Sequence, residues 1–184
     1  MKKCILITGT PGTGKTKYAK DLVDEIGNDY EYVDVSAVIR IKGLSEFHDE
    51  AKECDVVDEE KLVKELISRI ESSSNKLVID SHMIILPCEY VEKCIIMKCS
   101  IDELRKRLEL RKYSEDKVRE NLDCEIFDVC LSEAKEKGYP IEIIWTSEKK
   151  ENKTNKKRKN KKMILNKKKK NKLKKIKKMK KKRN

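Results

Sequence analysis

The chain has 184 residues, of which 45 are Lys or Arg and 33 are Asp or Glu, and this length suits one domain with a tail. From Lys149 to Asn184 there are 22 Lys or Arg and one Asp or Glu, a net charge of +21, so the other 148 residues carry −9. No apolar run approaches the roughly 20 residues of a membrane-spanning helix, and we expect no membrane partner. The seven cysteines include no C-x-x-C pair, which argues against a zinc ribbon or a disulfide ladder and for a reducing compartment.

The first half of the chain alternates between strand and helix patterns. Residues 3–8 form an apolar run that predicts a buried strand, and residues 15–26 have apolar side chains at spacings of three and four, as in a helix. Residues 30–35 alternate and contain β-branched side chains, which predicts a second strand. Residues 58–71 begin with acidic side chains and continue as an amphipathic helix.

The second half continues this alternation. Short apolar runs of buried-strand length lie at residues 76–80, 94–98 and 141–145. Residues 100–112 predict a helix in which Ser100 and Glu103 form a capping box. Residues 114–137 predict a single long helix.

This order of elements predicts an α/β fold with a mostly parallel, five-stranded sheet and helices on both faces. We assign residues 1–147 to this domain. Residues 148–184 are low in complexity and rich in lysine, so we expect a disordered, solvated tail.

The segment GTPGTGKT at residues 9–16 lies between the first strand and the first helix and fits the Walker A pattern. Its glycines, including Gly12 and Gly14, allow main-chain N–H groups to turn toward phosphates. Lys15 can reach the β and γ oxygens, and the Thr16 hydroxyl can bind Mg²⁺. The sequence therefore predicts a P-loop site for a nucleoside triphosphate.

A P-loop site needs an acid for Mg²⁺, and ligands bind at the carboxyl ends of parallel strands. Asp80 ends the strand predicted at residues 76–80 and is our candidate, although an ordinary turn aspartate would occupy the same place. His82 follows two residues later. A lone histidine is more often structural than catalytic, so both interpretations stay open for His82.

Arg107 and Arg111 lie four residues apart on one face of the predicted helix. This spacing could direct two guanidinium groups at transferring phosphoryl oxygens. A solvated helix surface explains the same spacing equally well.

These features together resemble a specific family, the adenylate kinase isoenzyme 6 family. The stretches that carry the resemblance are LITGTPGTGKT at 6–16, CDVVDEEKLVKEL at 54–66, VIDSH at 78–82 and RLELRKYSEDKVRENLDCEIFDV at 107–129. The resemblance implies an adenylate-kinase-like P-loop fold with a short lid. It also implies that the protein binds ATP and AMP, transfers a phosphoryl group between them with Mg²⁺, and hydrolyses ATP.

The resemblance also implies roles for individual residues. The ATP phosphates would be bound by Gly12, Gly14, Lys15, Thr16 and Lys17, the last through its main chain. Asp80 and His82 match the Walker B pair, Arg111 matches an arginine of the lid, and the AMP side would lie between residues 34 and 57 with Arg40 at the AMP phosphate. The family usually has glycine at the position of Lys112, and it ends in an acidic to amphipathic helix instead of a lysine-rich tail.

Three functions stay open at this point. The first is an ATP:AMP phosphotransferase that forms two ADP. The second is a nuclear assembly ATPase of the small ribosomal subunit that acts on a ribosomal protein during 18S rRNA maturation, with AMP phosphorylation incidental. The third is a P-loop kinase of another small acceptor.

The tail also has several interpretations. The lysine runs at residues 149–162 are compatible with nuclear import and with binding to the backbone of pre-ribosomal RNA. A plain solvated tail, or a thin apolar stripe of Leu173, Ile176 and Met179 on a basic helix, are the alternatives. We expect a monomer in the nucleus and leave a cytoplasmic pool open.

Overall fold

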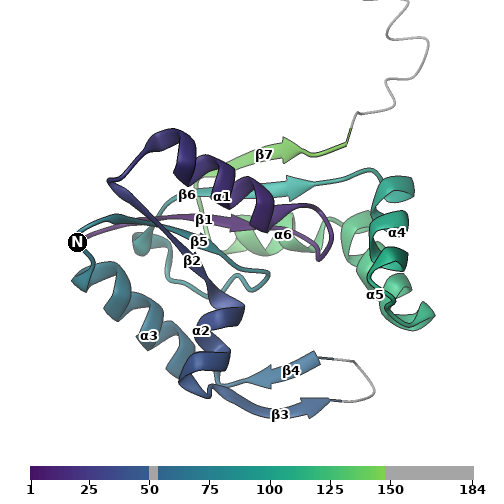
Figure 1. The fold of residues 1–184 in the computed structure, drawn as a ribbon, viewed down its shortest axis with the longest axis horizontal. Helices are drawn as coiled ribbons and strands as arrows, with labels where there is room; N and C mark the ends of the chain where they lie inside the picture. Colours follow the sequence, from purple (N-terminus) through teal and green to yellow (C-terminus); the bar gives the residue numbers. More distant parts are fainter. Residues whose placement is uncertain (50–53, 148–184) are drawn as a thin grey trace, which may run out of the picture. The chain divides into compact units, whose positions relative to one another are not determined.

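The central feature of the fold is a five-stranded sheet, seen in a computed structural model that describes residues 1–49 and 54–147 (Figure 1). All neighbouring strands are parallel and the order is β2-β5-β1-β6-β7. The strands are β1 (Cys4–Thr8), β2 (Tyr30–Asp34), β5 (Lys76–Asp80), β6 (Val91–Lys98) and β7 (Ile141–Trp145). The predicted five-stranded parallel α/β fold is therefore confirmed.

Helices cover both faces of this sheet because its strands are apolar on both sides. They are α1 (Lys15–Ile26), α2 (Val35–Lys42), α3 (Glu59–Ser72), α4 (Ile101–Leu110), α5 (Glu115–Ile126) and α6 (Val129–Glu136), with a short 3₁₀ helix η1 (Cys88–Tyr90). Helix α1 packs on Ile7 and Val78, whereas α2, α3 and α6 share a core with Leu6 and Ile79 on the other face. Helices α4 and α5 form their own cluster around Leu108 at one end of the sheet (Figure 1).

Register brings the predicted site residues to one edge of the sheet. Asp80 at the end of β5 is level with Ile7 of β1 and Asp34 of β2. The loop at residues 9–16 therefore begins beside the end of β5, as expected for a ligand site of a parallel sheet.

The structure adds elements between residues 35 and 57 that the pattern did not predict. Asp34 ends β2 and caps α2 by accepting hydrogen bonds from the N–H groups of Ser36 and Ala37. A hairpin of β3 (Ser45–Asp49) and β4 (Cys54–Val57) follows. These elements are too short, and the hairpin is too polar, to give a clear periodic signal.

Two helix predictions were wrong in detail. The long helix at 114–137 is broken at Asp128, which has φ of 55° and separates α5 from α6. Asp128 tolerates this conformation because its carboxylate pairs with Lys98. The capping box is absent: Ser100 precedes α4 without a side-chain cap, and Glu103 instead pairs with Arg107 at 3.1 Å.

Within residues 1–49 and 54–147, no helix is long and apolar enough to span a bilayer. The tail predicted at 148–184 lies outside the described residues.

Candidate functional site

Glycine shapes the loop between β1 and α1. Gly9, Gly12 and Gly14 have φ of 138°, 93° and 99°, a region that other residues rarely adopt. A Cβ atom on Gly9 would lie 2.4 Å from the main-chain oxygen of Met97, and one on Gly12 would lie 2.9 Å from Leu104. Only glycine fits these positions, and the loop is held tightly against β6 and α4.

Lys15 folds back over this loop. Its Nζ donates hydrogen bonds to the main-chain oxygens of Gly9 at 2.8 Å and Thr10 at 3.2 Å. Burial lowers the pKa of Lys15 to about 8, and the nearby Asp80 carboxylate opposes this shift. The Lys15 ammonium is thus poorly solvated, and phosphate oxygens would satisfy it better than two carbonyl groups do.

Asp80 and Thr16 form a pair of oxygen ligands at the carboxyl end of β5. The Thr16 hydroxyl donates to Asp80 Oδ2 at 2.6 Å, and Tyr32 of the neighbouring strand donates to the same oxygen at 3.2 Å. Asp80 is buried. Hydroxyl and carboxylate oxygens suit Mg²⁺, which takes its other ligands from phosphate and water, so this pair fits the expected ion.

The first turn of α1 completes the phosphate side of the site. Gly14 is the residue before the helix, and no side chain caps that end. The Lys17 side chain points away and pairs with Asp21 at 2.8 Å. The free N–H groups at this helix start are suited to an anion, which agrees with a main-chain role for Lys17.

His82 lies just beyond Asp80 in a tight turn. The Ser81 hydroxyl accepts a hydrogen bond from the Met83 N–H and donates one to the Met83 carbonyl, both at 2.9 Å. The His82 ring is exposed at the surface, but the protein around it and the charge of Lys15 lower its pKa, against the effect of Asp80. His82 is therefore neutral at pH 7.

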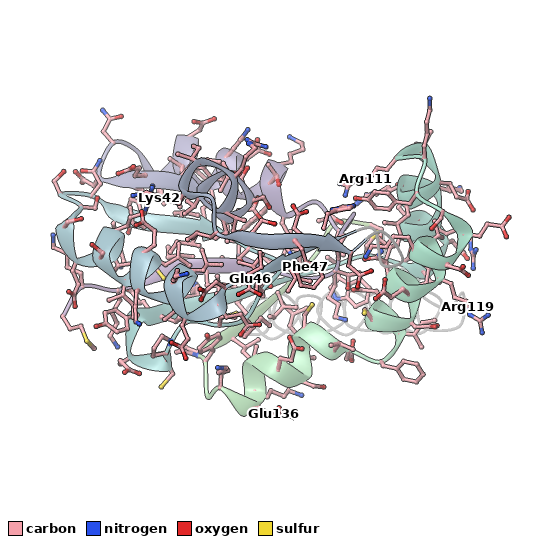
Figure 2. The ribbon with its side chains drawn as sticks, turned by 90° about the horizontal axis from the view of Figure 1, so that it is seen from below. Lys42, Glu46, Phe47, Arg111, Arg119 and Glu136 are labelled. Atoms are coloured by element: carbon pink, nitrogen blue, oxygen red, sulfur yellow. The ribbon has the colours of Figure 1, made fainter. Side chains whose placement is uncertain are left out.

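Arg111 and Arg40 lie on different parts of the molecule. Arg111 follows α4, and its charge is close enough to help lower the pKa of Lys15. Arg40 is exposed in the last turn of α2. Figure 2 shows Arg111 at the α4–α5 end and Lys42, the last residue of α2, toward the other end. The role of Arg40 at an AMP phosphate stays a prediction.

Arg107 is not a solvated surface residue, because it contacts the phosphate loop; its role at transferring phosphoryl oxygens stays a prediction. It donates to the Gly12 carbonyl at 3.3 Å and to the Thr146 hydroxyl at 3.1 Å, and it pairs with Glu103. The Thr146 hydroxyl in turn donates to the Thr13 carbonyl at 2.7 Å. Arg107 therefore braces the loop from α4, through contacts with Gly12 and Thr146 that the sequence pattern did not predict.

Replacing Arg107 with lysine is expected to lower the free energy of unfolding by about 1–2 kcal/mol, because the forked contacts to the loop and to Thr146 are lost while the charge stays. Thermal unfolding measures the effect. Arg105→Lys is the matched control, since Arg105 is exposed on the same helix. Equal melting temperatures for the two variants would contradict the bracing role.

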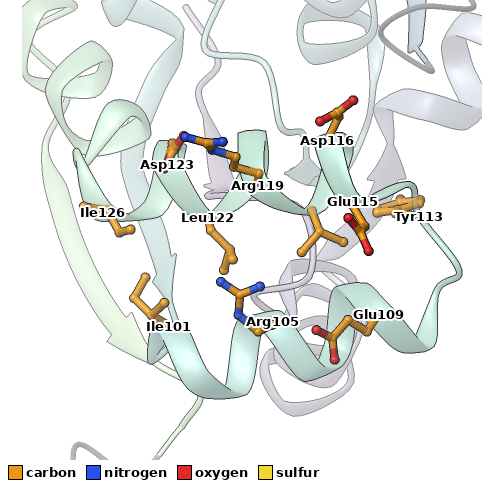
Figure 3. Close-up of a pocket in the computed structure, with 11 residues that line it drawn as sticks. Ile101, Arg105, Glu109, Tyr113, Glu115, Asp116, Arg119, Leu122, Asp123 and Ile126 are labelled. Atoms are coloured by element: carbon orange, nitrogen blue, oxygen red, sulfur yellow. The ribbon is translucent and has the colours of Figure 1, made fainter.

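A hollow lies between α4 and α5 (Figure 3) and has a volume of about 790 Å³. It is lined by apolar side chains, including Ile101, Val118 and Leu122, and by charged ones such as Arg105 and Asp123. A groove of about 850 Å³ runs from His82 between α3 and α6. Neither hollow is lined by the Lys15, Thr16 and Asp80 group, which we take as the centre of the site.

The parallel sheet, the glycine loop and the Lys15, Thr16 and Asp80 group define a P-loop nucleoside triphosphate-binding protein. Comparison with known proteins agrees, since a family model described as an AAA domain matches residues 5–128. A solved structure titled "Structure of the Pnkp1/Rnl/Hen1 RNA repair complex" aligns with 68% of this chain and 44% of its own, with a TM-score of 0.48 and 16% identity.

Several relatives are closer in sequence. The adenylate kinase isoenzyme 6 homolog of Caenorhabditis elegans is 35% identical over 133 residues, 72% of each chain. That of Dictyostelium discoideum is 36% identical over 160 residues, 84% of this chain and 89% of the relative. A putative adenylate kinase of Methanocaldococcus jannaschii is 38% identical over 139 residues, 75% of each chain. The chain belongs to the adenylate kinase isoenzyme 6 family and is a nucleotide kinase.

The site also contains residues that the sequence analysis missed. Tyr32 contacts the Asp80 carboxylate, and burial followed by that charge raises the pKa of its phenol. The one available signal was a polar aromatic side chain in the strand predicted at 30–35. The sequence did not show that the strand of Tyr32, β2, lies beside the strand of Asp80, β5, because about forty residues of chain separate them.

Proposed function

We propose that this protein transfers the γ-phosphoryl group of ATP to AMP, giving two ADP. The observation that carries the proposal is the 2.6 Å contact between Thr16 and Asp80, beside Lys15, at the carboxyl edge of the sheet. The acceptor would bind between residues 34 and 57, with Arg40 at its phosphate.

Different residues would bind the phosphates, the Mg²⁺ ion and the charge that develops during the transfer. Main-chain N–H groups from Gly12 to Lys17 hold the phosphates of ATP, and Lys15 stabilises charge that develops on the β and γ oxygens. Thr16 and Asp80 would hold Mg²⁺, and the ion would supply positive charge against the negative charge of the phosphates. Arg111 would come from the lid and add positive charge on the opposite side.

Hydrolysis of ATP is the second activity that we propose. Support comes from His82, which is exposed to water and close enough to Lys15 and Asp80 for both charges to act on its pKa. Because its pKa is lowered, the ring is neutral at pH 7 and can accept a hydrogen bond from a water molecule.

Replacing His82 with glycine is expected to slow ATP hydrolysis by about 10²-fold while the affinity for ATP stays near that of the wild type. If a neutral His82 is needed, hydrolysis by the wild type should fall at acid pH, and the fall should be centred below the ordinary histidine pKa of about 6.5, because burial lowers the pKa of His82. Phosphate release and calorimetry measure the two effects.

The control is His48→Gly, which removes the other histidine of the chain from the β3–β4 hairpin, where it pairs with Asp55 at 2.8 Å. Loss of ATP binding in His82→Gly would reassign His82 to a structural role.

We also propose that the protein acts in small-subunit ribosome maturation in the nucleus, as a monomer that contacts a ribosomal protein and pre-ribosomal RNA. The support is compositional: 22 cations between Lys149 and Asn184 suit a phosphate backbone, and a metabolic kinase has no evident need for them. The residues concerned lie outside those that the structure describes.

The ratio of ADP formed to ATP consumed distinguishes the three functions, which are transfer to AMP, ATP hydrolysis and transfer to another acceptor. Purified protein is incubated with ATP and Mg²⁺, with and without AMP. Two ADP per ATP in the presence of AMP supports phosphoryl transfer, whereas one ADP per ATP at a rate indifferent to AMP supports an assembly ATPase. Transfer to a different small acceptor, with AMP inactive, would support the third function.

Truncation after Ser147 is expected to leave phosphoryl transfer near the wild-type rate and to remove RNA association and nuclear accumulation together. RNA binding by the full chain should fall steeply with salt, because many counterions are released from the RNA. The measurements are kinase rate, RNA retention at two salt concentrations, and the location of a fluorescent fusion. Equal RNA retention by the two chains would refute the electrostatic role of the tail.

A further inference from the structure

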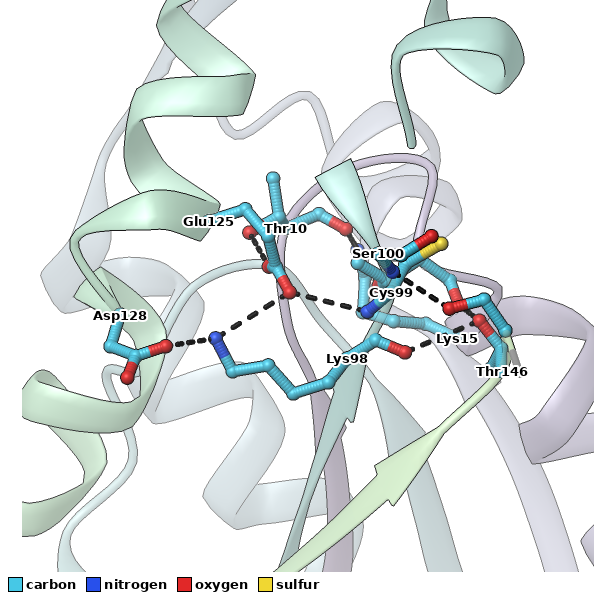
Figure 4. Close-up of polar contacts among 10 residues, drawn as sticks. Thr10, Lys15, Lys98, Cys99, Ser100, Glu125, Asp128 and Thr146 are labelled. Atoms are coloured by element: carbon cyan, nitrogen blue, oxygen red, sulfur yellow. Dashed lines mark hydrogen bonds and ion pairs between the residues drawn. The ribbon is translucent and has the colours of Figure 1, made fainter. Parts of the chain in front are cut away.

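A buried ionic group that contacts the phosphate loop joins Thr10 of the loop to the end of β6 and to α5 (Figure 4). Its centre is Glu125 in the last turns of α5, which is 6% exposed. One carboxylate oxygen accepts a hydrogen bond from the Thr10 hydroxyl at 2.6 Å. The other accepts from the Cys99 N–H at 3.2 Å and lies 3.5 Å from Lys98 Nζ. Lys98 also pairs with Asp128.

We propose that Glu125 is a positioning residue for nucleotide binding: its carboxylate holds Thr10, and through Thr10 it holds the phosphate loop and Lys15. The inference deepens the proposed function and rests on ATP being bound by this loop.

The path from Glu125 to Lys15 is short and continuous. The Thr10 side chain is fixed by Glu125, while the Thr10 carbonyl accepts hydrogen bonds from the Thr13 N–H at 3.2 Å, the Thr13 hydroxyl at 2.7 Å and Lys15 Nζ at 3.2 Å. Thr10 thus links an anchor in α5 to the turn of the loop and to the lysine. A small movement of Thr10 would change the direction of the loop N–H groups that face the phosphates.

The chemistry of the position explains why a carboxylate is needed. Thr10, Cys99 and Lys98 all act as donors toward Glu125. A carboxylate accepts from all three, whereas a glutamine could keep its oxygen on the Cys99 N–H only by turning its N–H₂ group to the Thr10 hydroxyl, which would reverse that hydrogen bond and remove the charge beside Lys98. The negative charge of Glu125 also lies 3.5 Å from the ammonium of Lys98, which is 5% exposed, and together with Asp128 it compensates this buried charge.

Thr10→Val tests the proposal because valine keeps the shape of threonine and removes the hydroxyl, while Glu125 keeps its contacts with Cys99 and Lys98. The affinity for ATP, measured by calorimetry, is expected to fall about tenfold, as for loss of a hydrogen bond to a charged group. Amide hydrogen exchange of the loop in the nucleotide-free protein is expected to quicken by a similar factor.

Thr8→Val is the matched control. Among the described residues, Thr8 Oγ1 is a buried side-chain oxygen without a hydrogen-bond partner, and it lies two positions before Thr10. The same chemical change at Thr8 should leave ATP affinity and loop exchange as in the wild type.

Glu125→Gln is the second variant, and it is expected to weaken ATP binding at least as much as Thr10→Val does. Combining the two substitutions should add little to Glu125→Gln alone, because both change the same contact between Thr10 and residue 125. If Glu125→Gln does not fold, the comparison of Thr10→Val with Thr8→Val still shows whether the Thr10 hydroxyl positions the loop for ATP.

Unchanged ATP affinity or unchanged loop exchange in Thr10→Val would overturn the inference, even if its melting temperature fell. A wild-type protein that binds no ATP would instead refute the proposed function on which the inference rests.

Discussion

Replacing Lys15 with alanine is expected to lower the rate of phosphoryl transfer by about 10³-fold, which is the largest effect of any single substitution considered for this chain. Lys15 is the cation that lies on the loop itself, bonded to the carbonyls of Gly9 and Thr10. Its ammonium would stay with the β and γ oxygens as their charge is redistributed in the transition state.

Proton uptake gives a second measurement of the same role. The pKa of Lys15 is lowered to about 8 in the nucleotide-free protein, chiefly by burial. Phosphate oxygens favour the charged ammonium and raise this pKa, so ATP binding should take up protons between pH 8 and 9. Calorimetry in buffers of different ionisation enthalpy measures the uptake, which should be absent in Lys15→Ala.

The control is Lys106→Ala, which removes an exposed lysine from α4. Near-normal turnover by the purified Lys15→Ala protein would show that the loop is not the site of catalysis.

Replacing Asp80 with asparagine is expected to raise the Mg²⁺ concentration for half-maximal activity by about 10- to 100-fold. The amide keeps the shape of the carboxylate and can still accept hydrogen bonds from Thr16 and Tyr32, which contact Asp80 at 2.6 and 3.2 Å. The substitution therefore removes only the negative charge that would face Mg²⁺. Activity should be partly restored by adding Mg²⁺.

A titration of rate against Mg²⁺ concentration measures this effect, and thermal unfolding checks that the variant is folded. Asp24→Asn is the control, since Asp24 is exposed on α1. The Mg²⁺ role of Asp80 would be wrong if the two variants gave the same titration curve.

The sequence by itself determined the sheet and the phosphate loop. Each central strand is a short apolar run, and the residues of β1 alternate between two cores, with Leu6 on one face and Ile7 on the other. The loop needs glycine where φ is positive and lysine at the start of α1, and both requirements are local. Such requirements can be recognised in the sequence because residues next to one another in the chain satisfy them.

Position within the sheet also made Asp80 predictable. A residue at the end of a buried strand lies at the carboxyl edge wherever that strand stands in the order, so Asp80 reaches the loop through β5, the neighbour of β1. Its partner Tyr32 was not predictable, because the pairing of β2 with β5 joins segments far apart in the chain.

Only the tertiary structure decided what the charged residues on the helices do. Arg107 has a spacing that suits phosphate binding, yet it contacts Gly12 and Thr146. Glu125 belongs to a stretch whose pattern predicts a helix and assigns this side chain no partner, yet it is buried against Thr10 and Lys98. The helix predicted at 114–137 ends because Asp128 turns to meet Lys98. A long charged side chain can reach in many directions, and its direction depends on which distant donors and acceptors the folded chain brings within hydrogen-bonding distance.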